Sequence, residues 1–262
     1  MPRIRVNGVS LHYEEQGDGV PILCIHGAGS SGAVWASAAR ELGRHGRAIV
    51  YDRRGSHRSE RPEPYETDLR QQAEDAAALL EALDAAPAIV IGRSYGGEVA
   101  IELALRRPES VRALAVLEAG ESLTDGGRRW LGELGERVEA AAAEDVGTVG
   151  ELVLREVLGD EGWEQAPALL KDLFVGNGPA IAAEFRGGFL DVPLEELRRI
   201  DCPVLLVGAE DSPPVFAEAI ELLAGTLPSA RVARVGGGHL IDPADPSVLA
   251  FVDEVAAQAA SR

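Results

Sequence analysis

The stretch Gly92-Arg93-Ser94-Tyr95-Gly96-Gly97 indicates the fold more strongly than any other part of this chain. It follows an apolar run, residues 87–91, and precedes a helix-like stretch, residues 98–107, so the order is strand, tight turn and helix. A serine at the apex of such a turn needs small residues two positions before and after it, because the strand end and the helix start nearly touch there. Its hydroxyl then projects clear of the sheet, beside a helix N-terminus that favours negative charge. We therefore predict that Ser94 is a nucleophile.

Size and composition indicate a globular protein with a substantial core. The chain has 262 residues, of which 46% are hydrophobic, and it contains no run of about 18 uncharged apolar residues that could span a membrane. The N-terminus alternates like a strand and lacks the apolar centre of a signal peptide, so we expect a cytoplasmic protein that binds no membrane. The net charge of −18 argues against nucleic acid as a partner. Cys24 and Cys202 lie in or beside apolar runs, and we expect core residues rather than a disulfide or a metal site.

Strand-like and helix-like segments alternate along most of the chain. After a hairpin at residues 4–15, strands are expected at 22–25, 47–51, 88–91 and 111–117, with helices at 33–44, 68–83 and 98–107. The alternation resumes with strands at 204–207 and 231–235 and helices at 215–223 and 246–259. Alternation at this spacing predicts an α/β fold with a doubly wound, parallel sheet.

The alternation is interrupted between residues 121 and 193, which contain helix-like stretches and no convincing strand. We therefore expect a core formed by residues 1–120 and 194–262, and a helical cap formed by residues 121–193. An insertion over the carboxyl edge of the sheet would act as a lid above a site at that edge.

A serine nucleophile needs a base that takes its proton, and His239 is the best candidate. It follows Gly236-Gly237-Gly238 at the carboxyl end of the last predicted strand, which is the same sheet edge as Ser94. The other histidines have structural interpretations, in a hairpin, at a helix end or in loops. His239 is therefore the predicted general base.

Acyl transfer also needs donors for a developing oxyanion. Two aimed backbone N–H groups stabilise that charge by several kcal/mol. The N–H of Tyr95, directly after the nucleophile, is one predicted donor. The other is the N–H of Ala28, because its neighbours Gly27 and Gly29 let the backbone turn toward the site.

Taken in chain order, these motifs resemble the α/β-hydrolase superfamily. The resemblance rests on His26-Gly27-Ala28-Gly29, Tyr51-Asp52-Arg53-Arg54-Gly55, the turn around Ser94, Gly208-Ala209-Glu210-Asp211 and Gly238-His239. It implies a mostly parallel eight-stranded sheet with an inserted helical cap, a triad in the order serine, acid, histidine, and no metal or organic cofactor. His57 departs from the pattern, because similar sequences usually have glycine there.

Two carboxylates compete for the role of triad acid. Asp211 follows the strand that ends near Gly208 and matches the commonest acid position of the family. Glu118 directly follows an apolar strand, so its side chain would point from the sheet into the cleft. A minority branch of the family, which includes enzymes similar to the fungal zearalenone lactonases, has a glutamate at this place. Both residues stay candidates, and Glu118 is preferred.

The residues favour a serine hydrolase that cleaves a carboxylic ester or lactone through an acyl-enzyme on Ser94. Alternatives are a C–C bond hydrolase or a cofactor-free perhydrolase of the same fold, and a non-catalytic ligand-binding protein on this scaffold. An apolar ceiling over the substrate is expected from Trp130, Trp163, Phe174 and Phe189. Few basic residues are aimed at the cleft, which favours a small, neutral, lipophilic substrate. The oligomeric state stays open.

Overall fold

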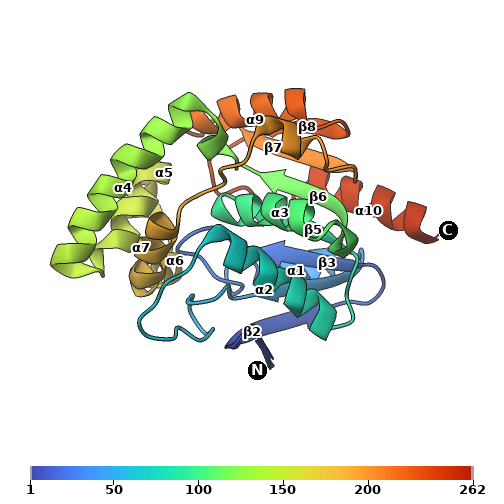
Figure 1. The fold of residues 1–262 in the computed structure, drawn as a ribbon, viewed down its shortest axis with the longest axis horizontal. Coiled ribbons are helices and arrows are strands. Elements are labelled where there is room, and N and C mark those ends of the chain that lie inside the picture. Colours follow the sequence, from blue (N-terminus) through green and yellow to red (C-terminus); the bar gives the residue numbers. More distant parts are fainter. Residues whose placement is uncertain (1, 261–262) are drawn as a thin grey trace.

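A single sheet runs through the computed structural model, which describes residues 2–260 (Figure 1). Its eight strands lie in the order β1-β2-β4-β3-β5-β6-β7-β8. Their bounds are β1 (Arg3–Val6), β2 (Val9–Gln16), β3 (Pro21–Ile25), β4 (Arg47–Tyr51), β5 (Ala88–Arg93), β6 (Val111–Leu117), β7 (Val204–Ala209) and β8 (Ala230–Val235). The β1–β2 and β2–β4 pairs are antiparallel, and the other pairs are parallel. The predicted mostly parallel, eight-stranded α/β sheet is confirmed.

Helices cover both faces of this sheet, so the central strands are buried on both sides and have continuous apolar sequences. One face packs against α2 (Leu69–Ala82), α3 (Tyr95–Arg106) and α9 (Pro214–Thr226). The other face packs against α1 (Ala36–Leu42) and α10 (Pro246–Ala260). Successive residues of a strand alternate between the two clusters, as Ile89 and Val90 of β5 do.

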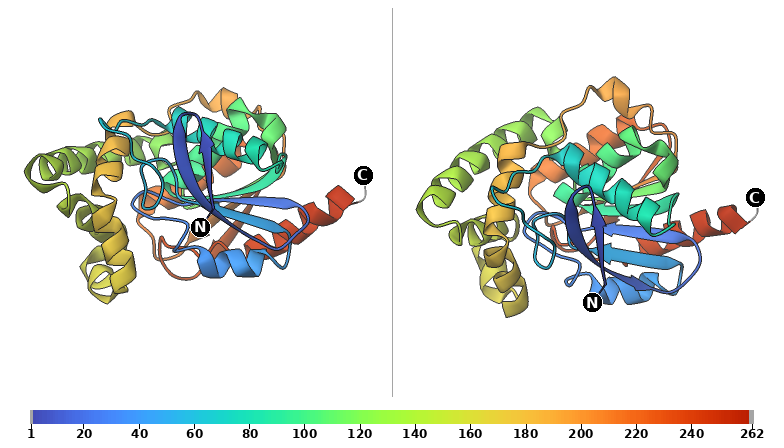
Figure 2. Two further views of the ribbon diagram at one scale, coloured as in Figure 1. Left: turned by 90° about the horizontal axis from the view of Figure 1, so that it is seen from below. Right: turned by 60° about the horizontal axis from the view of Figure 1, so that its bottom comes forward.

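The segment between β6 and β7 is helical, and we call residues 121–193 the helical insertion. Its helices are α4 (Asp125–Asp145), α5 (Thr148–Gln165), α6 (Ala168–Gly176) and α7 (Gly178–Gly187), preceded by the short turn η2 (Glu121–Leu123). The four helices lie together to one side of the sheet in all views (Figures 1 and 2). They share an apolar cluster of their own, which includes Leu134, Val149 and Trp163. Short α8 (Leu194–Leu197) leads back to β7.

Both cysteines are free, Cys24 within buried β3 and Cys202 just before β7. Burial raises the pKa of the Cys202 thiol to about 11. Between residues 2 and 260, no helix is both long and apolar enough to cross a membrane.

The loops that follow β3, β5, β6, β7 and β8 are the features that position a site, because parallel strands bring their carboxyl ends to one edge of the sheet.

Candidate active site

The turn between β5 and α3 holds Ser94 in a backbone conformation that residues other than glycine rarely adopt, with φ 54° and ψ −131°. Its N–H donates to the carbonyl oxygen of Leu117 at 2.9 Å, which ties the turn to the end of β6. A Cβ on Gly92 would lie 2.2 Å from the carbonyl oxygen of Gly96, and one on Gly96 would lie 2.4 Å from that of His26. Glycine is therefore required on both sides of Ser94, because the end of β5 meets the start of α3 at Gly92, and the end of β3 meets α3 at Gly96.

Ser94 and His239 line one small cavity, of about 40 Å³. Ser94 is half-buried, whereas His239 is buried. The remaining lining residues come from the loop after β3, the end of β5, the helical insertion and the loop after β8: Gly27, Ala28, Ser30, Arg93, Val153, Val157, Phe174 and Leu240. The structure thus brings together the predicted nucleophile, the predicted base and one predicted oxyanion residue.

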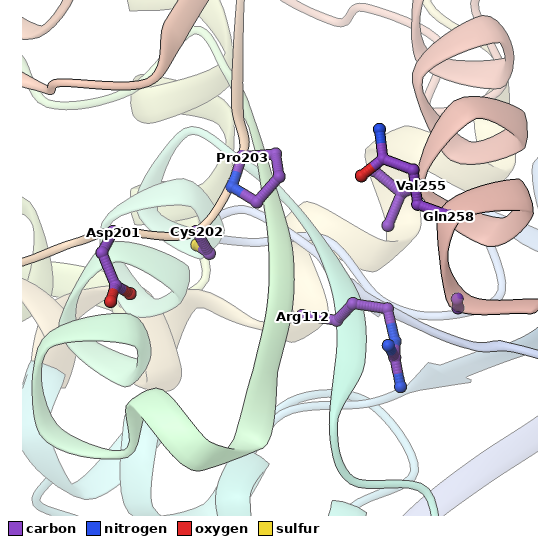
Figure 3. A pocket seen from close by; sticks show the side chains of 7 residues that line it. Arg112, Asp201, Cys202, Pro203, Val255 and Gln258 are labelled. Carbon is purple, nitrogen blue, oxygen red and sulfur yellow. The ribbon is translucent and has the colours of Figure 1, made fainter. Parts of the chain in front are cut away.

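A larger hollow, of about 380 Å³, lies at the opposite edge of the sheet (Figure 3). Arg112 near the start of β6, Pro203 just before β7 and Gln258 near the end of α10 contribute to its wall. None of the predicted catalytic residues lines it. The candidate site is therefore the smaller cavity.

Glu118 faces His239. One carboxylate oxygen, Oε2, lies 3.4 Å from Nδ1 of His239, and the other accepts the N–H of Ala209 at 2.7 Å. Glu118 is fully buried, its φ is 48°, and its own N–H donates to the carbonyl oxygen of Val207 at 2.9 Å. The ends of β6 and β7 together hold this carboxylate toward the imidazole.

Asp211 is placed differently. Its side chain is exposed, and its backbone N–H donates to the carbonyl oxygen of Gly237 at 2.9 Å. Within residues 2–260, the Asp211 carboxylate makes no ion pair with His239 or with any other residue. The geometry therefore pairs the histidine with Glu118 and leaves Asp211 as a solvated loop charge.

The surroundings of His239 favour a neutral imidazole. Burial lowers its pKa most, the hydrogen bond and charge of Glu118 raise it, and the Arg93 cation lowers it. The Phe216 ring lies over the imidazole, with ring centres 4.2 Å apart and planes inclined by 31°. Sequence reasoning missed Phe216, because one phenylalanine in an apolar helix carries no signal of what it covers.

A buried arginine supports the loop that carries Ala28. Arg53 donates to the carbonyl oxygens of His26 at 2.9 Å and Gly27 at 3.1 Å, and to Oε1 of Glu184 in α7 at 2.7 Å. Its backbone N–H also donates to Nε2 of His26 at 3.0 Å, so this imidazole has a structural role. The contacts fix the backbone on which the predicted oxyanion donor lies.

The helical insertion holds the same loop from its other end. The side-chain amide of Asn177 donates to the carbonyl oxygens of Gly29 and Ser30, both at 3.0 Å. Its carbonyl oxygen accepts the N–H of His57, whose φ of 44° explains why glycine is usual there in similar sequences. The insertion and the loop therefore form one hydrogen-bonded unit.

Of the four aromatic residues expected over the substrate, only Phe174 lines the cavity. Trp130 packs edge-on against Phe216 with ring centres 5.7 Å apart, and Phe189 packs edge-on against Tyr95 at the same separation. Trp163 lies in the apolar cluster of the insertion. These three rings are used in helix packing, and the apolar wall of the cavity comes from smaller residues, Val153 and Val157, that the sequence did not single out.

Comparison with known proteins agrees with this geometry. The family model for the alpha/beta hydrolase fold matches residues 20–241. The chain belongs to the α/β-hydrolase family. A relative named "Putative carbamate hydrolase RutD", from Azorhizobium caulinodans, is 29% identical over 95% of each chain.

Two further comparisons cover almost the whole chain. The 2-(acetamidomethylene)succinate hydrolase of Mesorhizobium japonicum is 26% identical over 94% of this chain and 91% of its own. The crystal structure of an alpha/beta hydrolase from Sphaerobacter thermophilus is 25% identical, with a TM-score of 0.79 over 96% of this chain and 99% of that one. The named reactions differ, so family membership establishes hydrolase chemistry and leaves the substrate to be argued from the site.

Proposed function

We propose that this protein is a serine hydrolase that cleaves a carboxylic ester or lactone through an acyl-enzyme on Ser94. The observation that carries the proposal is the contact of 3.4 Å between Nδ1 of His239 and Oε2 of Glu118, beside a cavity that Ser94 shares. A histidine oriented through Nδ1 has Nε2 available for the serine hydroxyl. No metal or organic cofactor takes part in the proposed reaction.

The proposed mechanism has two halves. Ser94 Oγ attacks the carbonyl carbon while His239 Nε2 takes its proton, and the oxyanion accepts hydrogen bonds from the N–H groups of Ala28 and Tyr95. The tetrahedral adduct collapses, and the imidazolium gives its proton to the departing alkoxide. Water then attacks the acyl-enzyme with His239 again as base, which releases the acid and restores Ser94. Glu118 stabilises the imidazolium in both halves.

Covalent labelling tests the nucleophile. We expect a fluorophosphonate to label the protein once, and Ser94→Ala to abolish both labelling and the hydrolysis of p-nitrophenyl acetate. Ser37→Ala is the matched control, because Ser37 is an exposed serine on α1. Undiminished labelling or turnover in Ser94→Ala would show that the proposed chemistry is wrong.

Carbamate hydrolysis is a second candidate. It is favoured by the relative of that name, which matches 95% of this chain, and by a cavity of only about 40 Å³. A carbamate ion has four non-hydrogen atoms and would suit so small a space. Ammonium release from carbamate that is faster than the spontaneous reaction and is lost in Ser94→Ala would support it, whereas turnover of esters alone would exclude it.

A further inference from the structure

An unpaired cation lies in the wall of the catalytic cavity. Arg93 is 5% exposed, lines the cavity with Ser94 and His239, and donates from Nη1 to the carbonyl oxygen of Ile241 at 2.8 Å. In the part of the chain that the structure describes, no carboxylate forms an ion pair with it. The negative charge of Asp242 raises the pKa of Arg93, but the Asp242 side chain is exposed and accepts the N–H of Ala244.

Two further buried polar groups, one in the same cavity and one on a ring against Arg93, have no hydrogen-bond partner within residues 2–260. The Ser30 hydroxyl lines the same cavity, is 2% exposed as a residue and has no partner. The indole N–H of Trp35 is likewise buried and unpartnered. The guanidinium carbon of Arg93 lies 5.5 Å from the centre of the Trp35 ring. Buried polar groups in folded proteins are rarely left unpaired, and an exception calls for a ligand or ion that satisfies it.

Arg53, a second buried arginine next to the site, shows which partners a structural arginine has in this fold. Arg53 bonds to two carbonyl oxygens and to the Glu184 carboxylate. Arg93 has one carbonyl and no carboxylate. Burial lowers the pKa of Arg93 to about 10, as expected for a cation removed from water without a counterion. An acceptor with negative charge in this cavity would compensate the guanidinium and give the Ser30 hydroxyl a partner.

We propose that Arg93 and Ser30, with the Trp35 ring against the Arg93 guanidinium, form a subsite for a carboxylate that the substrate carries on its acyl group. This inference rests on the proposed ester or lactone hydrolysis and specifies its substrate class: short acyl groups that end in a carboxylate. The cavity of about 40 Å³ suits such a group, since it is far smaller than the several hundred Å³ of sites for drug-sized ligands. This proposal departs from the expectation of a neutral substrate, because it specifies an anionic one.

A pair of esters that differ only in the acyl carboxylate tests the subsite. We expect the wild type to have a higher kcat/KM for mono-p-nitrophenyl succinate than for p-nitrophenyl acetate. Arg93→Met keeps an unbranched stem against Trp35 but removes the charge, so the ratio of the two values should fall roughly 30-fold or more. Ser30→Ala should lower the same ratio by a smaller factor.

Arg112→Met is the matched control. Arg112 also forms no ion pair within residues 2–260, but it lies in the hollow at the opposite sheet edge (Figure 3). The substitution removes the same charge from the molecule, so it corrects for long-range attraction of an anionic substrate. The ratio should stay at the wild-type value in Arg112→Met. A ratio that falls equally in both variants, or in neither, overturns the subsite.

Ligand-induced stabilisation provides a second test that needs no turnover. Sodium acetate should raise the Tm of the wild type and of Arg112→Met, because a ligand that binds only the folded state stabilises it. Acetamide and sodium chloride at equal concentrations should not. Equal shifts with acetate and chloride, or with acetate and acetamide, would contradict a carboxylate subsite. If Arg93→Met does not fold, the ester ratio of Ser30→Ala and the effects of acetate, acetamide and chloride on the wild-type Tm still test the subsite.

The two proposals fail in different ways. Ester turnover that persists in Ser94→Ala rejects the proposed function. Turnover that depends on Ser94, but with the same acetate-to-succinate ratio in wild type and Arg93→Met, rejects the subsite alone.

Discussion

Ser94 and Glu118, at the single-residue scale, both have positive φ, of 54° and 48°. Non-glycine residues rarely adopt such angles, and they persist only where the surrounding structure imposes them. Here each residue directly follows a buried strand and is fixed by a backbone hydrogen bond to the neighbouring strand, Ser94 to Leu117 and Glu118 to Val207. The strained conformations lie at the carboxyl edge of the sheet, where Glu118 contacts His239 and Ser94 lines the same cavity as His239.

Paired substitutions distinguish the two candidate acids. Glu118→Gln keeps the shape of the side chain but removes the charge that stabilises protonated His239, so kcat should fall roughly 10²–10⁴-fold. Asp211→Asn should lower kcat by about tenfold or less, because Asp211 is exposed and makes no contact with the imidazole. Steady-state kinetics with p-nitrophenyl acetate measure both. A larger loss in Asp211→Asn would assign the acid to the loop after β7.

The pH dependence of kcat/KM reports the state of His239. The base must be neutral, so activity should fall as the pH drops through the pKa of His239 in the free enzyme. Burial lowers that pKa, and we expect the acidic limb to lie below 6.5, the usual value for histidine. Glu118 raises the pKa, so Glu118→Gln should move the limb further down, whereas Arg93→Met should move it up. Shifts in the opposite directions would show that another group titrates.

At the scale of elements, the sequence predicts the sheet edge well and the cavity wall poorly. β5, the turn after it and β6 are recognisable because buried parallel strands are continuously apolar and small residues must flank the serine. The positions of the strand ends then predict that Ser94 and His239 meet with an acid, for which both Glu118 and Asp211 are candidates. The wall is different, since Trp163 and Val157 both belong to helical apolar patterns, and only three-dimensional packing shows which one faces the cavity. Arg93 lies within the deciding motif, but its lack of a counterion is visible only in the fold.

The turn at the start of the helical insertion contains a buried carboxyl, Glu121, whose protonated form is favoured in the folded protein. Burial and the nearby charge of Glu98 raise the pKa of Glu121 well above its usual value, and Oε2 of Glu121 has no hydrogen-bond partner among the described residues. A carboxyl whose pKa is higher in the folded state binds more protons there than in the unfolded chain, so its contribution to stability is present below pH of about 4 and is lost as the pH rises toward the folded-state pKa.

Replacing this carboxyl with an amide should therefore stabilise the protein in neutral solution. We expect Glu121→Gln to raise the Tm at pH 8 by about 2–4 °C, corresponding to about 1 kcal/mol, and to have less effect at pH 5. Thermal unfolding at the two pH values measures this. The exposed Glu109→Gln serves as control and should change the Tm little at either pH. A lower Tm of Glu121→Gln at pH 8 would show that the ionised carboxylate is needed.

At the scale of the whole molecule, the helical insertion is joined to the sheet by buried polar contacts near the site. Glu184 of α7 pairs with Arg53, and Asn177 holds the loop of Gly29. Glu98 of α3 accepts the Ser122 hydroxyl at one end of the insertion and the N–H of Leu190 at the other, at 2.5 and 2.8 Å. The insertion therefore supports the candidate oxyanion loop as well as covering the cavity.

The pair of Arg53 and Glu184 tests this coupling, because both side chains are fully buried and lie 2.7 Å apart. Glu184→Gln leaves the guanidinium buried without its counterion, which should lower the free energy of unfolding by about 3–5 kcal/mol. It should also lower kcat for p-nitrophenyl acetate, since Arg53 holds the carbonyl oxygens of His26 and Gly27. Denaturant unfolding and steady-state kinetics measure the two effects.

A surface ion pair between α7 and α4 gives the control. Arg186 of α7 and Glu139 of α4 are about half-exposed and 3.3 Å apart, so Glu139→Gln should change stability by at most about 1 kcal/mol and leave kcat unaltered. The double variant Arg53→Met/Glu184→Leu removes both buried charges and should recover part of the lost stability, because no ion is then left uncompensated. It should not recover kcat, since without Arg53 the loop lacks the guanidinium donors that hold the carbonyl oxygens of His26 and Gly27. If stability and kcat return together in the double variant, then the loss of kcat in Glu184→Gln comes from the uncompensated charge of Arg53. The loop then positions Ala28 without the hydrogen bonds of the guanidinium.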